Sequence, residues 1–140
     1  MNLRGNILEA IEELANDFNG ELTLKNRQRQ YIYVNNGWIK LHGLSREQVL
    51  GKIDAEFFTP ATSMQIMMAD KKAIEKKLPD EYLIKFNTGH TTVVRVVTKW
   101  AVYHDSGELF CICTLSVKPE NKRNIYDVRK KVEALFEKVI

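Results

Sequence analysis

The stretch from Tyr31 to Phe58 constrains the fold of this 140-residue chain more than any other part of it. It begins with the β-prone run 31–34, and Asn35-Asn36-Gly37 then ends the strand, because asparagine and glycine accept turn conformations. Several very short helical segments follow. An ordinary βα unit would use one helix of ten or more residues, so this stretch predicts an unusual α+β layout.

Each short segment carries its own start or stop signal. Gly43 suits a left-handed helix cap, and Ser45 with Gln48 three residues later forms a capping-box pattern. We expect Asp54 to cap the third segment, with Glu56 as a favourable anion in its first turn. A structural role therefore explains this pair of carboxylates without invoking catalysis.

The run YVNNGWIKLHGLSREQVLGKIDAEFF resembles the core of a PAS domain. The matching residues are Asn35, Trp38, Gly43, Leu44, Ser45, Glu47, Val49, Leu50, Gly51, Lys52, Asp54, Phe57 and Phe58. The resemblance implies a sensory module of bacterial regulators. It also implies an α+β fold: a five-stranded antiparallel sheet with short helices on one face and flanking N- and C-terminal helices.

The remaining segments agree with that layout in number and order. We expect strands over 21–25, 81–87, 91–103 and 108–117, and one long helix over 61–78 that Thr62 or Ser63 caps. Short connections between the last three strands predict an antiparallel meander. The run VTKWAVYHDSGELFCICTLSV resembles the end of a PAS domain, but Ser-Val-Lys-Pro follows where many members carry Asp-Ile-Thr before the output helix.

Both ends of the chain predict amphipathic helices. Residues 6–18 carry an apolar stripe, and the helix expected over 120–140 carries a short a/d heptad seam. The stripe and seam residues are Ile7, Ile11, Leu14, Phe18, Ile125, Val128, Val132, Leu135 and Val139. The seam has two interpretations: a dimeric signalling helix that leads to an output domain, or a helix that folds back on the sheet. The strands expected over 91–103 and 108–117 carry apolar residues on both faces, so both faces need a cover, and the apolar stripe of residues 6–18 could supply one of them.

These features predict three parts: an N-terminal amphipathic helix (1–19), a PAS core (20–118) and a C-terminal signalling helix (119–140). We expect a cytoplasmic location, because the chain has no long apolar run and no signal peptide. We also expect a homodimer that has no catalytic activity of its own. It would relay a signal to an output domain such as a histidine kinase, a cyclic-dinucleotide enzyme or a transcription factor.

The charge distribution leaves one alternative partner open. Residues 118–140 hold seven Lys or Arg against four Asp or Glu, out of 21 and 18 in the whole chain, so the body is neutral. A neutral body argues against a nucleic-acid surface there. Nucleic-acid contact through Arg123, Arg129, Lys130 and Lys131 on the basic C-terminal helix remains the alternative.

Residues that could carry chemistry are few. No hydrolase triad, metalloprotease motif or phosphate loop occurs. We expect His42 to end a helix and His90 and His104 to lie in turns, all three as solvated residues. Cys111 and Cys113 lie two apart in a strand and are expected to be buried thiols. Within the resemblance, flavin is disfavoured because 52–58 contains no cysteine, and haem because the long helix contains no histidine.

A cavity between sheet and short helices is the remaining candidate site. We expect it to be lined by Phe57, Phe58, Met64, Met67, Ile74, Val96, Trp100, Cys111 and Cys113. Such side chains either fill the space or leave an adaptable pocket for a small apolar ligand. Both outcomes are compatible with the sequence.

Overall fold

The computed structural model describes residues 5–88 and 91–137. The strands are β1 (Glu21–Lys25), β2 (Tyr31–Val34), β3 (Asp80–Thr88), β4 (Thr91–Tyr103) and β5 (Leu109–Val117). The helices are α1 (Gly5–Asn16), α2 (Asn36–His42), α3 (Arg46–Val49), α4 (Pro60–Lys76) and α5 (Lys122–Glu137), with 3-10 turns η1 (Asp54–Glu56) and η2 (Pro119–Asn121). No helix within these residues is long and apolar enough to cross a membrane.

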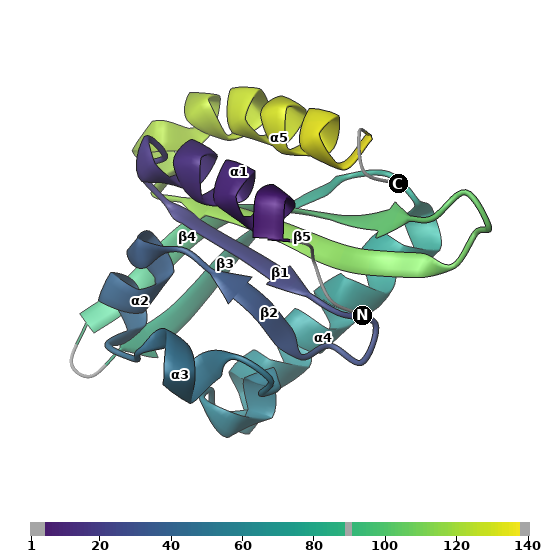
Figure 1. Cartoon of the computed structure of the whole chain (residues 1–140). Helices are drawn as coiled ribbons and strands as arrows, with labels where there is room; N and C mark the ends of the chain where they lie inside the picture. The colour runs from purple at the N-terminus through teal and green to yellow at the C-terminus, as the bar shows by residue number, and fades with distance from the viewer. Residues whose placement is uncertain (1–4, 89–90, 138–140) are drawn as a thin grey trace.

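One antiparallel sheet contains all five strands in the order β2-β1-β5-β4-β3 (Figure 1). The hairpin β1–β2 joins the meander β3–β4–β5 through pairing of β1 with β5, in the middle of the sheet. The predicted α+β fold with a five-stranded antiparallel sheet is confirmed. β1 and β4 have the predicted bounds, and β3 and β5 differ from prediction by one residue at their ends.

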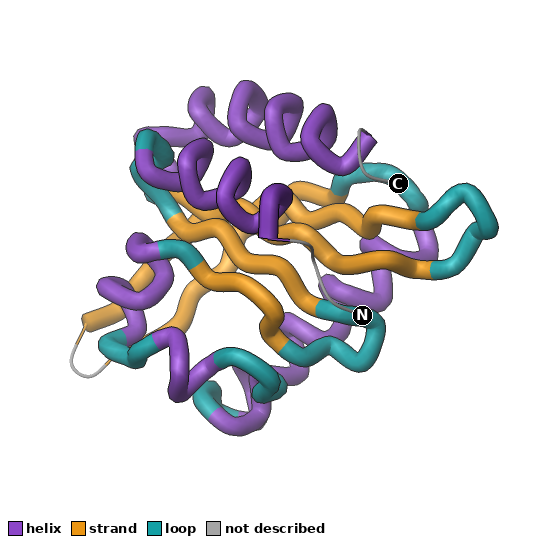
Figure 2. Tube along the Cα trace, in the orientation of Figure 1, coloured by secondary structure: helices purple, strands orange, loops and turns teal. Residues whose placement is uncertain are grey.

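Helices cover both faces of this sheet. α1 and α5 lie side by side on one face, which we call the outer face, and α2, α3 and α4 lie on the other, the inner face (Figures 1 and 2). Strand alternation distributes side chains between the two faces. On β5, for example, Cys113 and Leu115 belong to the core under α1 and α5, whereas Thr114 and Ser116 face a cavity on the inner side.

The outer face holds the main apolar core. Ile7, Ile11 and Phe18 of the N-terminal segment meet Ile125 and Val132 of α5 there, and all five are buried. Leu14, Val128 and Leu135 are half-buried against the same cluster, and Val139 lies outside the described residues. The stripe of α1 therefore covers the sheet as expected, and α5 follows the second interpretation of its seam, since it folds back onto the sheet.

A buried asparagine and two glycines fix the turn that follows β2. The Asn35 carboxamide accepts from the Leu22 and Trp38 backbone N–H groups and donates to the Gly20 carbonyl, so it caps α2 and ties it to β1. A Cβ at Gly37 would lie 2.1 Å from the Gly20 carbonyl oxygen. Only glycine fits this approach of α2 to the sheet.

Three local predictions are corrected. α4 begins one turn earlier than Thr62 or Ser63 would allow, because Thr59 is its N-cap and Pro60 occupies the first helical position. Asp54 does not cap η1; its carboxylate is buried in an ion cluster instead. The C-terminal segment starts as the 3-10 turn η2 before it becomes α5.

Candidate functional site

A cavity of about 70 Å³ lies between the inner face of the sheet and the helices α2 and α4. Its polar wall is made by side chains of the central strands: Glu21, Thr23, Lys25, Arg95, Lys99, Thr114 and Ser116. The rest of the lining is mainly aromatic and aliphatic: Trp38, His42, Phe58 and Ile66 lie on the helix side, and Tyr82 and Phe86 belong to the edge strand β3. The site can therefore bind a molecule that is polar on one side and apolar on the other.

The sheet register aligns the polar wall in rows. Thr114 pairs with Thr23 on one side and with Lys99 on the other, so these three side chains form one row across β1, β5 and β4. Ser116 pairs with Glu21 and Val97 in the next row. Side chains directly opposite each other in such rows have Cβ atoms about 5 Å apart, so one small ligand can touch a whole row.

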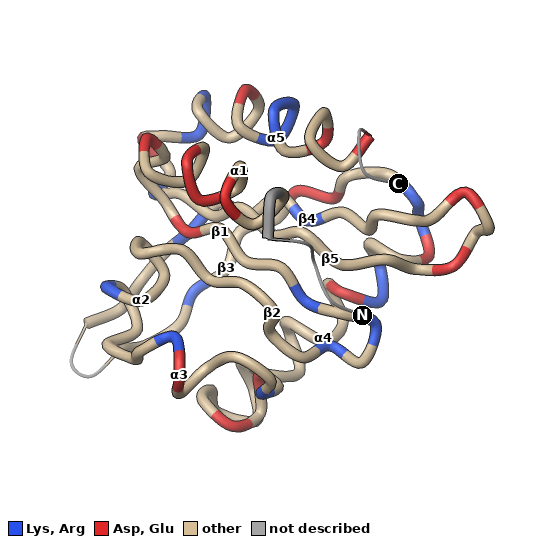
Figure 3. Tube along the Cα trace, in the orientation of Figure 1, with Lys and Arg blue, Asp and Glu red and all other residues tan. Residues whose placement is uncertain are grey.

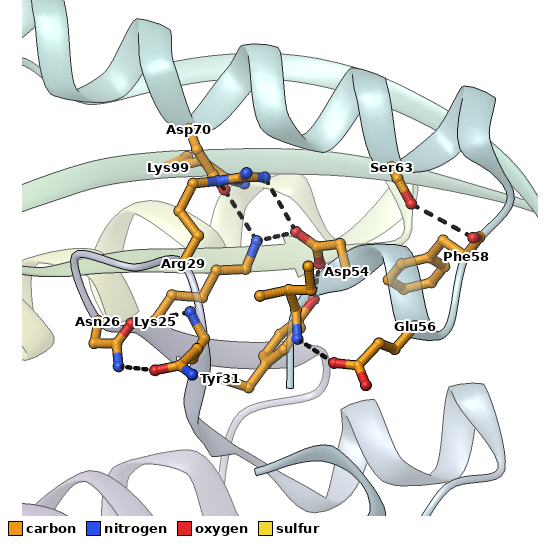
Figure 4. A network of polar contacts seen from close by, with 12 residues as sticks. Lys25, Asn26, Arg29, Tyr31, Asp54, Glu56, Phe58, Ser63, Asp70 and Lys99 are labelled. Atoms are coloured by element: carbon orange, nitrogen blue, oxygen red, sulfur yellow. Dashed lines mark hydrogen bonds and ion pairs between the residues drawn. The ribbon is translucent and has the colours of Figure 1, made fainter. Parts of the chain in front are cut away.

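Beside this wall lies a buried ion cluster that joins the sheet to η1 and α4 (Figure 4). The Lys25 ammonium donates to Asp54 Oδ2 at 2.5 Å and to Asp70 Oδ2 at 3.0 Å, and Lys99 Nζ donates to Asp70 Oδ1 at 2.5 Å. Arg29 Nε donates to Asp70 Oδ2 at 3.0 Å. Both lysines and both aspartates have side chains at most 2% exposed, so each charge depends on its partners instead of on water.

Burial and charge shift several pKa values in this cluster. Burial alone would raise the pKa of Asp70, but the Lys99 and Lys25 ammonium groups hold it well below its usual range. Tyr31 donates its hydroxyl to Asp54, and burial together with that carboxylate raises the pKa of Tyr31. Asp70 is therefore ionised and Tyr31 is neutral near pH 7.

The β1–β2 hairpin loop positions the third cation. Asn26 Oδ1 accepts from the backbone N–H groups of Gln28 and Gln30, and Arg29 lies between them with a φ of 64°. A left-handed backbone is unfavourable for arginine, so the surrounding contacts must hold it. Those contacts are the ones that its guanidinium makes with Asp70 and Asp54.

His42 ends α2 as expected, but it is not the solvated residue that we predicted. Its ring centroid lies 4.3 Å from that of Trp38, 5.3 Å from Phe58 and 5.4 Å from Phe86, and it lines the cavity. Burial, and secondarily the Arg95 charge, lower the pKa of His42 to about 4. It is therefore a neutral ring in an aromatic wall at physiological pH. His104 packs against Phe110, and His90 lies outside the described residues.

The cavity differs in composition from the predicted set. Phe58 lines it, and Phe57 packs beside Tyr31 and Trp38 at its edge. Met64 is 52% exposed, and Met67 and Ile74 are half-buried outside the lining. The lining positions of α4 are Thr62 and Ile66 instead.

Four predicted lining residues lie on the wrong face of the sheet. Val96, Trp100, Cys111 and Cys113 belong to the outer core. The expectation that they line the cavity is wrong, because their neighbours in sequence hold the inward positions of β4 and β5. The two thiols are buried as expected, with their sulfur atoms 3.9 Å apart, and burial raises the pKa of Cys113.

An ion pair separates the cavity from a groove on the surface. Arg95 Nε donates to Glu21 Oε1 at 2.7 Å, and Ser116 donates to the same oxygen at 2.9 Å. Glu21, Arg95 and Leu41 line both the cavity and a neighbouring groove that includes Lys40 and Lys118. The Arg95–Glu21 ion pair therefore belongs to the lining of both spaces.

The basic side chains of α5 occupy a helix of mixed charge (Figure 3). Arg129 lies 3.5 Å from Glu133 and over the Tyr126 ring, and Lys130 lies over the same ring. Arg123 and Lys131 are exposed. Nucleic-acid contact through these residues stays a prediction. Within residues 5–88 and 91–137, no group of three or more His, Cys, Asp or Glu side chains could hold a metal ion.

Comparison with known proteins adds independent support for the fold. The solved PAS domain of Bordetella pertussis BvgS superposes with a TM-score of 0.68 at 16% identity, over 91% of this chain and 99% of that one. VqmA of Vibrio cholerae, in a complex with ligand and DNA, superposes with a TM-score of 0.67 at 22% identity, over 79% of this chain and 50% of that one.

A curated relative is similar over most of the sequence. A diguanylate cyclase of Vibrio cholerae serotype O1 is 26% identical over 129 residues, which cover 90% of this chain. The chain spans only 38% of the length of that relative. The family model described as PAS domain matches residues 20–116. This match covers most of the chain and all of the sheet except Val117, and we conclude that the chain belongs to the PAS domain family, the sensor domains of signalling proteins.

Proposed function

We propose that this domain senses a small molecule in its inner cavity and relays the binding event through β5 to α5, without catalysis of its own. The observation that carries the proposal is the alternation of β5. Thr114 and Ser116 line the cavity, while Leu115 and Val117 pack under α1 and α5. A shift of this strand by a ligand would therefore move the surface on which α5 lies.

The contact between α5 and the sheet favours such movement. Among the described residues, Thr98 Oγ1 and Trp100 Nε1 are buried without a hydrogen-bond partner, and Arg129 Nε has the Glu133 carboxylate at 3.5 Å without a hydrogen bond to it. Thr98 and Trp100 lie on β4, two residues apart in the strand and thus on one face, and Arg129 lies on α5. Each unpaired buried group costs about 1–3 kcal/mol, so this docked position of α5 is less favourable than its apolar contacts alone suggest.

The related proteins supply the kinds of output that we propose. VqmA has been solved bound to DPO and in a complex with ligand and DNA, and the curated relative is named a diguanylate cyclase. By analogy we propose that this domain regulates an effector of the transcription-factor or cyclic-dinucleotide class. A histidine kinase output, a cytoplasmic location and the division at residues 19 and 119 remain predictions from sequence.

Dimerisation is a separate part of the proposal. VqmA is described as a dimer, which supports the expectation of a homodimer here. The seam residues Ile125 and Val132 are buried against the chain's own sheet, so a dimer that uses them requires α5 to leave it. Light scattering tests this: a mass that stays at 16.2 kDa at high micromolar concentration contradicts the homodimer.

The relay is tested by filling the cavity from the helix side. Thr62 lines the cavity from α4, so Thr62→Met adds volume there without changing the sheet. Gln65→Met, at an exposed position of the same helix, is the matched control. We expect amide hydrogen exchange in residues 122–137 to accelerate by roughly five-fold in Thr62→Met only, because α5 opens locally at lower cost.

Unchanged exchange in α5 would contradict the relay, provided that circular dichroism shows a folded variant. Ile66→Phe is a second variant that fills the same space from the next turn of α4. If both variants fold and neither alters α5, the cavity and the terminal helix are not coupled.

A further inference from the structure

We propose that the inner cavity binds a small carboxylate of about two to four carbons, whose anionic group is held by Lys99 with the hydroxyls of its row. This inference rests on the proposed sensory function and names the class of molecule sensed. It follows from the charge balance, the free donors and the size of the cavity.

The charge balance on this side of the sheet is positive. Lys25, Lys99 and Arg29 contribute three positive charges to the ion cluster, against two negative charges from Asp54 and Asp70. The two lysines line the cavity and the two aspartates do not. A ligand in the cavity would thus contact the two lysines and not the two aspartates, which favours an anion.

The second neighbouring ion pair does not cancel this excess. Arg95 and Glu21 also line the cavity, and they neutralise each other at 2.7 Å. Arg95 lies where the cavity meets the surface groove that contains Lys40 and Lys118. This route is itself basic, so it would attract an anion towards the cavity.

Lys99 has donors to spare. An ammonium group has three N–H donors, and among the described residues Lys99 Nζ has one partner, Asp70. Its side chain is 2% exposed, so bulk water does not satisfy the other two. Thr23, Thr114 and Tyr82, each of which carries a hydroxyl group, also line the cavity. These donors converge on one place, because Thr23, Thr114 and Lys99 form one row of the sheet.

Size and shape restrict the rest of the ligand. Sites for drug-sized ligands have volumes of roughly 300–1,000 Å³, so a cavity of about 70 Å³ restricts the ligand to one small organic molecule. Phe58 and Ile66 lie on the helix side, across from the donors of the sheet, and suit a short alkyl group. A carboxylate bound in this way would replace ordered water and pair the spare charge.

The test uses the whole chain with sodium propionate as the probe. Propionamide, which has the same shape without the charge, and propylammonium chloride are the matched compounds. We expect saturable binding of propionate in isothermal titration calorimetry. Propionamide should bind at least about ten-fold more weakly, because charge-assisted hydrogen bonds are stronger than neutral ones. Propylammonium should not bind. Lys99→Met should weaken propionate binding by about ten-fold or more, while Asp70 keeps Lys25 and Arg29 as partners.

Two further variants test whether a loss of propionate binding is specific to the donors that line the cavity. Lys71→Met, at an exposed position of α4, should leave propionate binding unchanged. Thr114→Val removes one donor of the row without touching the ion cluster and should weaken binding several-fold. Absence of saturable propionate binding, equal binding of propionamide, or full binding by Lys99→Met each overturns the carboxylate proposal. The α5 exchange experiment decides the relay independently, so failure of one proposal is distinguishable from failure of the other.

Discussion

The two faces of the sheet are built from the same strands, but one is packed with apolar side chains and the other contains buried ions. On the outer face, apolar residues such as Leu22, Leu115 and Val117 are at most 1% exposed under α1 and α5. On the inner face, the same strands place Lys25 and Lys99 inside the protein, equally buried but charged. The outer face gains stability from the removal of apolar surface from water, whereas the inner face must first compensate the loss of hydration of its ions.

This difference indicates which face is functional. A core made only for stability has no need of buried charges, because apolar residues of similar volume often stabilise a protein at least as well. The inner face keeps four buried charges next to a cavity, where they can recognise a ligand. The outer face carries the unpaired Thr98 and Trp100 atoms beneath α5, where they lower the cost of moving a helix. We infer that one face receives the signal and the other transmits it.

The largest expected effect lies on the inner face. Asp70→Asn removes the carboxylate that Lys25, Lys99 and Arg29 share, and leaves Lys99 without a charged partner among the described residues. We expect the free energy of unfolding to fall by about 3–5 kcal/mol, since breaking a buried ion pair strands a charge. Urea denaturation measures this. Asp105→Asn, in an exposed loop, is the control; a loss below about 1 kcal/mol for Asp70→Asn would show that water reaches the cluster.

The next effect belongs to the outer face. Ile11 of α1 is fully buried between the sheet and α5, so Ile11→Ala leaves a cavity in the main core. We expect a loss of about 2–4 kcal/mol in urea denaturation. Met68→Ala on α4, where the side chain is 62% exposed, should change stability by less than about 0.5 kcal/mol. Equal values for the two variants would mean that α1 is not docked on the sheet in solution.

The sequence predicted the architecture well because the signals for it are local. Asn35, Gly43 and Ser45 act on the backbone within a few residues of themselves, and all three cap helices as expected or flank them. Strand bounds followed from alternation and turn residues. The family resemblance then fixed the number and order of the elements.

The site was predicted poorly because its parts are distant in sequence. Lys25 and Lys99 are 74 positions apart, and no local pattern links them to Asp54 or Asp70, which resemble ordinary helix-surface aspartates. One signal was available: each lysine occupies an inward position of a strand that is otherwise buried. The error over Trp100 and Cys113 has the same origin. The alternation of side chains along a strand shows which residues share a face of the sheet, but it does not show which of the two faces lines the cavity.

The stability of the inner face depends on pH, because its aromatic wall contains His42. Burial lowers the pKa of His42 to about 4, below its ordinary value of 6.5. The unfolded chain thus binds the proton more readily between pH 6.5 and 4, so the contribution of His42 to stability is complete above pH 6.5 and is lost as the pH falls through this window. The loss attributable to His42 amounts to at most about 3 kcal/mol.

This dependence is measured as the difference in unfolding free energy between pH 7 and pH 4.5. His42→Phe keeps an aromatic ring beside Trp38 and Phe86 but cannot take up a proton. We expect the variant to lose less stability on acidification than the parent protein. Equal losses would place the imidazole in water and remove it from the wall of the cavity.

The smallest expected effect tests whether the unpaired Thr98 hydroxyl on the outer face lowers the stability of the domain. Thr98 is 1% exposed and its hydroxyl has no partner among the described residues, so Thr98→Val keeps the shape and removes an unpaired polar atom. We expect a gain of about 1 kcal/mol in urea denaturation, together with slower hydrogen exchange in α5. Thr91→Val, at an exposed position of the same strand, should be neutral within about 0.5 kcal/mol. A loss of stability in Thr98→Val would mean that the hydroxyl is satisfied by water or by a shifted α5, and that the helix is not held in an unfavourable position.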